Sequence, residues 1–248
     1  MSELIVGRNN VLAALDAQRS LNKIYVAKSF RGDLQTLLDL AREQGCPLQF
    51  VPREKLDGLA GGLNHQGVLA EAAPWQYVEL AELLARLEPA AKPLLLVLAG
   101  IEDPHNLGAL LRIGECAGVS GVILPRRRSV QLTAAVARVS MGAIETVPVS
   151  RVGNLAQTLE TLKKAGFWLA AADMEGQSFW QMKWDFPVAL ILGGEGKGVP
   201  RLLKEKSDFI VGIPVQGKVN SLNVSVAGAV ILYEILRQRT GPDGLPGN

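Results

Sequence analysis

The most unusual group of polar residues lies at the start of the last apolar helix that the sequence predicts. The segment from Asn220 to Arg239 reads NSLNVSVAGAVILYEILRQR. Its second half has apolar residues at helical spacing and ends on arginines, where the helix dipole favours cations. Its first half crowds Asn220, Ser221, Asn223 and Ser225 into one turn. Because a helix N-terminus needs one such residue as its cap, capping accounts for one or two of the four and leaves the others unexplained.

A second candidate group lies in the segment GIEDPHNLGALLRIGECAG, residues 100–118. Asp103 or Asn106 can cap the helix that follows, and Pro104 stiffens the turn. Arg112 follows Asn106 by six residues inside an otherwise apolar helix. Helical spacing places it within two turns of the loop. A solvated arginine on a well-capped helix is the simpler interpretation of this segment taken alone.

A third candidate group is the glycine-rich segment LILGGEGKGVP, residues 190–200. It is not a Walker A loop, because Gly198 stands after Lys197 where that loop needs serine or threonine. The glycine spacing does not fit the dinucleotide-binding pattern either. The segment therefore predicts a place where backbone must come close to another group, and Glu195 within it has no evident packing role.

Composition excludes several classes of site. Two cysteines and two histidines among 248 residues make neither a disulfide framework nor a zinc set, so we expect no metal. No apolar run reaches the length of a membrane span, and the N-terminus lacks the pattern of a signal peptide. We therefore expect a cytoplasmic protein without a membrane partner. The net charge of +2 neither requires nor excludes nucleic acid.

Short apolar strands alternate with amphipathic helices in two stretches of the chain, which predicts an α/β fold. In the second stretch the strands are continuously apolar, which is typical of a mainly parallel sheet covered on both faces. The predicted organisation is an N-terminal α/β domain at residues 1–72, a linker at 73–92, a C-terminal domain at 93–240 and a disordered tail at 241–248. The predicted strands are 3–6, 22–28, 47–51, 67–72, 93–100, 121–125, 145–150, 167–173, 187–194 and 208–215. In such a sheet the loops that follow strands form the ligand site, and all three candidate groups lie in such loops.

Three motifs together resemble the SpoU (TrmH) branch of the SPOUT RNA methyltransferases. They are DPHNLGALLR at residues 103–112, LGGEGKGV at 192–199 and IPVQGKVNSLNVSVA at 213–227. In addition, LNHQGVLAE at residues 63–71 is similar to the end of the small ribosomal-protein-like domain of large-subunit ribosomal RNA guanosine 2′-O-methyltransferases. The resemblance covers nearly the whole chain.

The resemblance implies a fold, a cofactor and a set of site residues. The C-terminal domain should carry a deep trefoil knot, bind S-adenosylmethionine without a metal, and form a homodimer. Residues expected to hold the cofactor are Leu192, Gly193, Gly194, Ile213 and Leu222. Residues expected to line the reaction site are Asn106, Arg112, Glu195, Ser221 and Asn223. The polar turn at residues 220–225 would then face a ligand.

The implied activity is ribose 2′-O-methylation of RNA, with a guanosine of 23S ribosomal RNA as the first choice of target. Arginine is protonated throughout the usable pH range, so we interpret Arg112 as a cation that anchors a phosphate and stabilises the forming alkoxide. A general-base role and action across a dimer interface both stay open. The other hypotheses are a transfer RNA target, a resistance-conferring ribosomal nucleotide, or a non-catalytic RNA-binding or ribosome-assembly protein.

Support for RNA contact within the sequence is local. Arg126, Arg127 and Arg128 follow a predicted strand and suit phosphate contacts, although a solvated charged loop explains them nearly as well. His65 and Gln66 are candidates for RNA contact, and an ordinary polar turn is an equal interpretation. The N-terminal domain is expected to recognise folded RNA by its shape and its splayed bases.

Overall fold

The computed structural model describes residues 3–30, 34–218 and 221–240, and within them the chain forms two compact units. The N-terminal unit comprises Met1–Gln76 and Gln131–Thr146, and the C-terminal unit comprises Tyr77–Val130 and Val147–Asn248. Among the described residues, none of the helices combines the length and the apolar character that crossing a bilayer requires. The predicted tail and Asn220 lie outside the described residues.

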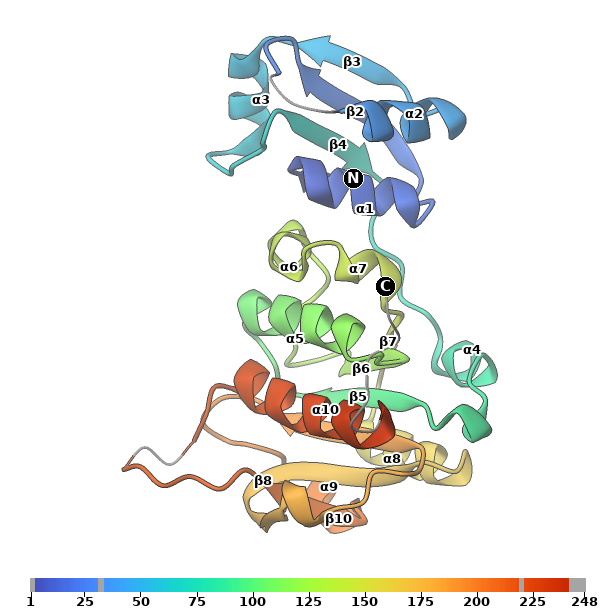
Figure 1. Ribbon diagram of the computed structural model, residues 1–248, viewed down its shortest axis with the longest axis vertical. Helices are drawn as coiled ribbons and strands as arrows, with labels where there is room; N and C mark the ends of the chain where they lie inside the picture. The colour runs from blue at the N-terminus through green and yellow to red at the C-terminus, as the bar shows by residue number, and fades with distance from the viewer. Residues whose placement is uncertain (1–2, 31–33, 219–220, 241–248) are drawn as a thin grey trace. The chain divides into compact units, whose positions relative to one another are not determined.

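The N-terminal unit contains a mixed four-stranded sheet in the order β1-β4-β2-β3 (Figure 1). Strand β4 is antiparallel to both β1 and β2, and β3 is parallel to β2. A small apolar core, which includes Tyr25, Leu56 and Leu69, packs on this sheet. The elements are β1 (Glu3–Val6), α1 (Arg8–Asp16), β2 (Leu21–Ala27), α2 (Gln35–Glu43), β3 (Leu48–Val51), α3 (Arg53–Ala60) and β4 (Val68–Ala72).

Two helices from later in the chain also belong to the N-terminal unit. They are α6 (Ala134–Ser140), which contacts β1, and α7 (Ala143–Thr146), which contacts α1. The sequence-based boundaries placed both helices in the C-terminal domain. The difference has a physical basis, because an amphipathic helix pattern shows that one face is buried but not which sheet buries it.

Arg19 is the centre of a polar cluster that joins three separate segments of the N-terminal unit. Its guanidinium lies 2.8 Å from Glu145 of α7 and 3.2 Å from Glu3 of β1, and it stacks 4.0 Å from the ring centroid of Trp75. The indole N–H of Trp75 donates to the same Glu145 oxygen at 2.8 Å. Because the side chains of Arg19 and Glu145 are almost fully buried, removal of Arg19 would leave the Glu145 carboxylate without its ion-pair partner, whereas removal of Glu145 would leave Arg19 paired with Glu3.

The C-terminal unit is built on a parallel six-stranded sheet in the order β10-β8-β9-β5-β6-β7. Its strands are β5 (Leu94–Ala99), β6 (Gly121–Pro125), β7 (Val149–Val152), β8 (Trp168–Ser178), β9 (Val188–Gly193) and β10 (Phe209–Gly212). Its α-helices are α4 (Leu80–Ala85), α5 (Pro104–Cys116), α8 (Leu155–Lys164), α9 (Arg201–Lys206) and α10 (Val224–Thr240). Short 3₁₀ turns occur at Pro89–Ala91 and Phe179–Gln181.

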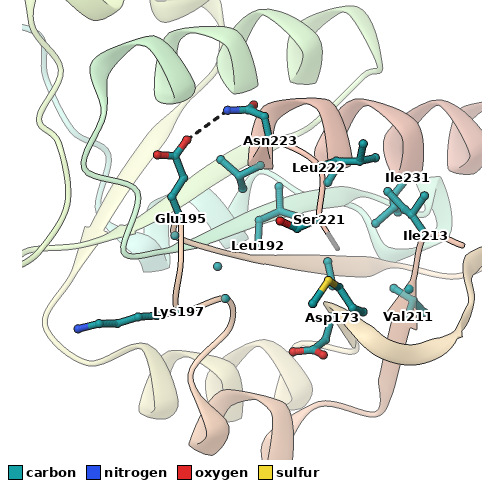
Figure 2. A pocket seen from close by; sticks show the side chains of 18 of the residues that line it. Asp173, Leu192, Glu195, Lys197, Val211, Ile213, Ser221, Leu222, Asn223 and Ile231 are labelled. Carbon is teal, nitrogen blue, oxygen red and sulfur yellow. Dashed lines mark hydrogen bonds between the residues drawn. The ribbon is translucent and has the colours of Figure 1, made fainter. Parts of the chain in front are cut away.

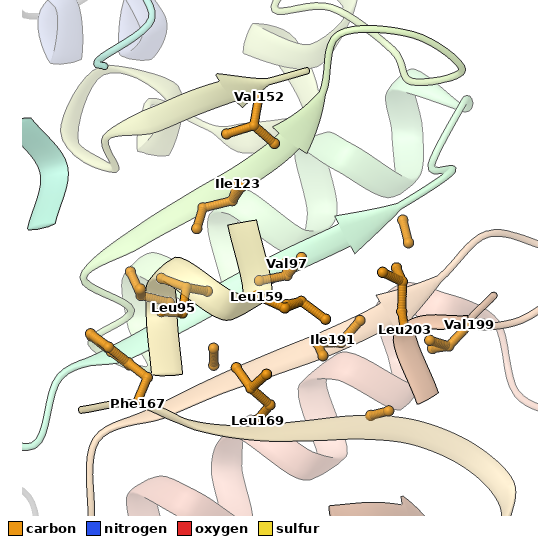
Figure 3. Packing of buried hydrophobic residues seen from close by; sticks show 14 of the residues in the cluster. Leu95, Val97, Ile123, Val152, Leu159, Phe167, Leu169, Ile191, Val199 and Leu203 are labelled. Atoms are coloured by element: carbon orange, nitrogen blue, oxygen red, sulfur yellow. The ribbon is translucent and has the colours of Figure 1, made fainter. Parts of the chain in front are cut away.

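Helices cover both faces of this sheet, as the continuous apolar strands predict. On one face, Leu159 of α8 and Leu203 of α9 pack with Leu95, Ile123 and Ile191 of the strands (Figure 3). On the other face, α10 lies beside α5 (Figure 1). The two helices approach closely at Gly228, where a Cβ atom would lie 2.7 Å from a methyl carbon of Leu110.

The end of α10 is fixed by Arg239. Its guanidinium donates to the carbonyl oxygens of Lys92 at 2.7 Å, Phe186 at 2.7 Å and Trp184 at 3.0 Å. Lys92 precedes β5 and Phe186 precedes β9, so the arginine ties the last helix to the amino ends of central strands. Its partial burial lowers the pKa of Arg239.

The α/β class, the order of elements and the parallel C-terminal sheet are confirmed. Three boundaries differ most from the sequence prediction. Strand β8 runs to Ser178 instead of residue 173, β10 ends at Gly212 instead of residue 215, and the predicted strand at 145–150 is helical up to Thr146 before β7 begins.

Candidate functional site

A pocket of about 510 Å³ opens at the carboxyl ends of β9 and β10 and beside the middle of β8. Four segments line it: residues 172–174, 192–198, 211–215 and several residues between 221 and 231 (Figure 2). Parallel sheets bind ligands at this edge, and the volume is within the usual range for small-molecule sites. Apolar side chains such as Leu192, Val211 and Ile231 form much of the wall.

The glycine loop after β9 forms one side of the pocket and can be built only from glycine at two positions. A Cβ atom on Gly193 would lie 1.9 Å from the carbonyl carbon of Gly198, and one on Gly194 would lie 2.0 Å from the oxygen of Gly100. Two backbone hydrogen bonds hold this close approach. The N–H of Gly194 donates to the carbonyl oxygen of Ala99 at 2.9 Å, and the carbonyl oxygen of Gly194 accepts from the N–H of Gly198 at 3.0 Å. The sequence prediction of a close backbone approach agrees with this geometry.

Three polar side chains from segments far apart in the sequence meet beside the pocket. The side-chain amide of Asn223 donates to Glu195 Oε1 at 3.2 Å (Figure 2) and to Asn106 Oδ1 at 3.0 Å. The amide of Asn106 donates to the same Glu195 oxygen at 2.7 Å, and Asn106 is buried. Asn106 belongs to α5 and Glu195 to the glycine loop, whereas Asn223 precedes α10. The three motifs found in the sequence therefore converge on one hydrogen-bonded cluster.

Asn223 also caps α10. Its Oδ1 accepts from the backbone N–H of Ser225 at 2.9 Å and from the Ser225 hydroxyl at 2.6 Å. Capping thus uses the oxygen of Asn223 and leaves its amide for Asn106 and Glu195. This division answers part of the question raised by the polar turn, because Asn223 and Ser225 serve the cap while Ser221 lines the pocket.

The structure brings together most of the predicted site residues but not Arg112. The pocket is lined by Leu192, Gly193, Gly194, Glu195, Ile213, Ser221, Leu222 and Asn223, and Asn106 joins through its hydrogen bonds. Arg112 is exposed on α5 and does not line the pocket. Among the residues that the structure describes, its side chain has no hydrogen bond or ion pair.

Asp173 is a pocket residue that the sequence prediction missed. It lines the pocket from β8, and its carboxylate lies 2.8 Å from Lys204 of α9. Burial opposes its ionisation, but the hydrogen bonds from Lys204 and from the backbone N–H of Glu175 hold the pKa of Asp173 below its ordinary value. Its place at the end of an apolar predicted strand is the signal that could have identified it.

The candidate RNA contacts lie in different environments. Arg126, Arg127 and Arg128 are exposed after β6, as expected for phosphate contacts. His65 is only 3% exposed, in contrast to the expected RNA contact. Its Nδ1 accepts from the backbone N–H of Gly67 at 2.9 Å, and its Nε2 lies 2.9 Å from Asp57, so both ring nitrogens serve the fold. Gln66 is exposed.

Comparison with protein families identifies both parts of the chain. Residues 93–233 match the SpoU rRNA Methylase family, and residues 4–78 match the RNA 2′-O ribose methyltransferase substrate-binding family. A Bacillus subtilis protein, YacO, whose name assigns it to the TrmH family of tRNA/rRNA methyltransferases, is 44% identical over 240 residues, or 96% of each chain. The chain therefore belongs to the SpoU/TrmH family of RNA 2′-O-methyltransferases.

Solved structures share its fold. A crystal structure named RNA 2′-O ribose methyltransferase is 30% identical, with a TM-score of 0.78, and the match covers 95% of this chain and 88% of that one. The SpoU methyltransferase AviRb from Streptomyces viridochromogenes, in complex with AdoMet, is 21% identical with a TM-score of 0.80, covering 96% and 90% of the two chains. S-adenosylmethionine is thus bound in a structure of the same fold.

Proposed function

We propose that this chain transfers a methyl group from S-adenosylmethionine to a ribose 2′-hydroxyl of RNA, with a guanosine of large-subunit ribosomal RNA as its target. The observation that supports this most strongly is the convergence of Asn106, Glu195 and Asn223 beside the glycine-loop pocket. A protein that only bound RNA would have no need for a pocket and a polar cluster side by side.

The residues of the pocket fit this cofactor. Gly193 and Gly194 leave backbone on the pocket wall where any Cβ would clash, and Ile213 and Leu222 line the same space. Apolar walls with a few backbone and polar groups suit a molecule that has both an adenine ring and charged ends. When bound, S-adenosylmethionine supplies an electrophilic methyl group on a sulfonium.

The side chains of this chain then position the nucleophile. Asn106 and Asn223 both donate to Glu195 Oε1, so the carboxylate is held and its second oxygen is left for a ribose hydroxyl. Orientation of reacting groups of this kind can lower a barrier by about 7–11 kcal/mol. Ser221, on the pocket wall, supplies a further hydroxyl near the same place.

We propose that Arg112 acts as the cation that anchors a phosphate and stabilises the forming alkoxide in a site completed by a second copy of the chain. In one copy it is exposed on α5 and lies outside the pocket. Helix α10, which packs beside α5, exposes the apolar side chains Val226 and Tyr233. A homodimer through this pair of helices would bury them and bring the partner's arginine to the pocket.

Mixed dimers test this arrangement. Arg112→Ala and a bulky Gly193 variant should each be inactive alone. If the arginine acts across the interface, a purified heterodimer of the two regains about half the wild-type activity per dimer, because one site receives both defects and the other receives neither. A folded, demonstrably mixed heterodimer that stays inactive contradicts action across the interface.

We also propose the trefoil knot that the family resemblance implies. Its support is the meeting of segments 192–198, 211–215 and 221–224 in one pocket, at the carboxyl edge of the sheet. A crystallographic chain trace through residues 213–224 decides it.

The N-terminal unit is proposed to choose the RNA, as a ribosomal-protein-like substrate-binding domain. A transfer RNA target is the second candidate, because the name of the Bacillus subtilis relative covers both classes of RNA. The decisive experiment maps 2′-O-methyl groups in the ribosomal and transfer RNA of a deletion strain. Loss of one ribosomal guanosine methylation is the expected result, and an unchanged methylation map contradicts the proposal.

A further inference from the structure

A second cavity, of about 260 Å³, lies at the carboxyl ends of β6 and β7 in the C-terminal unit. Arg126 immediately follows β6, and Arg151 is the next-to-last residue of β7. The remaining wall is Tyr77, Val78 and Glu79, from the segment that precedes α4. Val78 is fixed against the edge strand by a backbone bond to Val149 at 2.9 Å.

Arg151 is held in place without using up its donors. Its guanidinium lies 4.9 Å from the ring centroid of Tyr77, a cation–π contact. One terminal nitrogen donates to the carbonyl oxygen of Arg126 at 2.9 Å. Its Nε is buried without an acceptor among the described residues. The cation is therefore oriented by an aromatic face and one backbone bond, while further N–H groups make no bond within the described structure.

The charge around this cavity favours an anion. Arg126 is exposed, and its side chain has no hydrogen bond or ion pair in the part of the chain that the structure describes. Arg127 and Arg128 follow it and are also exposed. Glu79 opposes them, so the lining carries two positive charges and one negative charge. Planar guanidinium groups are well suited to phosphate oxygens.

The position of the cavity relates it to the methyl-transfer site. Because every strand pair in this sheet is parallel, the carboxyl ends of β6, β7 and β9 lie on one edge. In the order β9-β5-β6-β7, two to three strand spacings separate them, or about 10–14 Å. An RNA strand that reaches the glycine-loop pocket can therefore cross the second cavity along the same edge.

We propose that this cavity, which Tyr77, Glu79, Arg126 and Arg151 line, binds a backbone phosphate of the RNA substrate. Arg126 and Arg151 donate to the phosphate, and Tyr77 fixes the plane of the Arg151 guanidinium. Glu79 limits the affinity, so that the site holds a phosphate without trapping the product. The inference rests on the proposed function and adds a contact site outside the three family motifs.

The experiment measures binding of a fluorescein-labelled, single-stranded RNA of mixed sequence by fluorescence anisotropy over a range of salt concentrations. Arg126→Gln keeps the backbone carbonyl that Arg151 uses. It should weaken binding about 3- to 10-fold at low salt. It should also reduce the slope of log Kd against log salt by about 0.7, the value for one phosphate contact on a single strand. Glu79→Gln should strengthen binding, a sign that no loss of folding produces.

Arg237→Gln is the matched control, because it removes the same charge. Arg237 is on the last turn of α10. Arg239 ties this end of the helix to the amino ends of the strands, so Arg237 lies at the edge of the sheet opposite to the cavity. S-adenosylmethionine binding is measured on every variant and should be unchanged.

The outcomes separate the two proposals. Equal salt slopes for Arg126→Gln and Arg237→Gln, or weaker binding by Glu79→Gln, overturn the phosphate site and leave the methyltransferase assignment intact. A wild-type protein that binds RNA but no S-adenosylmethionine contradicts the proposed function and not this site. A wild-type protein that binds no RNA overturns the phosphate site.

Discussion

Replacement of Gly194 by alanine tests whether the glycine loop is constrained by backbone contact. A Cβ atom there would lie 2.0 Å from the Gly100 oxygen, although Cβ atoms essentially never come closer than 3.0 Å to such a neighbour. At least 1 Å of movement must be absorbed by backbone on both sides, because no side chain can rotate away. Overpacking of this kind costs about 1–3 kcal/mol. For a chain of this length the midpoint of thermal unfolding should fall by about 2–12 °C.

Gly153→Ala is the matched control. No atom lies within 4 Å of a Cβ built on Gly153, and its φ is outside the left-handed region. Here the substitution mainly reduces the conformational entropy of the unfolded chain, which stabilises the folded protein by about 0.4–1 kcal/mol. The same chemical change should therefore move the unfolding temperature in opposite directions at the two positions.

Differential scanning calorimetry with and without S-adenosylmethionine measures both variants. Gly194→Ala should also lose most of the cofactor-induced stabilisation, because the loop that forms the pocket wall must shift. The reasoning is refuted if Gly194→Ala unfolds at the wild-type temperature and binds the cofactor with unchanged affinity.

Three other substitutions, two of them with a matched control variant, have definite expected outcomes. Asn223→Ala should lower the free energy of unfolding by about 1 kcal/mol, because the α10 cap is lost, and it should also reduce methyl transfer. Its control is Asn154→Ala, which removes the similar cap of α8. The control should lower the free energy of unfolding without reducing turnover at saturating RNA. Arg239→Ala should lower the free energy of unfolding by at least about 2 kcal/mol, because three carbonyl partners are lost. Arg237→Ala, which removes only an exposed pair, should cost less than about 1 kcal/mol in the same urea titration. Asp173→Asn should lower stability at neutral pH. Because the pKa of Asp173 is depressed in the folded protein, the difference in unfolding free energy from wild type should shrink as the pH falls below 3.8, the ordinary pKa of aspartate. A difference that persists in acid would exclude the Lys204 ion pair as its cause.

Residue patterns predicted the order of elements because burial leaves a strong periodic signal. The apolar strands β5, β6 and β9 were readable since both of their faces are covered. Asn106, Glu195 and Asn223 were expected at one site because the family resemblance of the three motifs implies it, and the structure brings them into one hydrogen-bonded cluster.

Other features depend on tertiary contacts that leave no local pattern. His65 reads as an exposed turn residue, and only the fold shows that Asp57 and Gly67 use both of its nitrogens. Asp173 follows an apolar run as any strand end does. The pairing of Arg19 with Glu145 joins residues 126 positions apart, which no spacing rule predicts.

The placement of α6 and α7 has a consequence for synthesis of the chain. The N-terminal unit is discontinuous, since Gln131–Thr146 complete it although they lie between β6 and β7 of the other unit. The first 76 residues leave the ribosome without the carboxylate of Glu145 that Arg19 and Trp75 share. At about 5–20 residues per second, the missing segment follows about 4–14 seconds later. The N-terminal unit therefore cannot finish folding when its first 76 residues emerge, and its completion waits for β5 and β6 of the parallel sheet to be made.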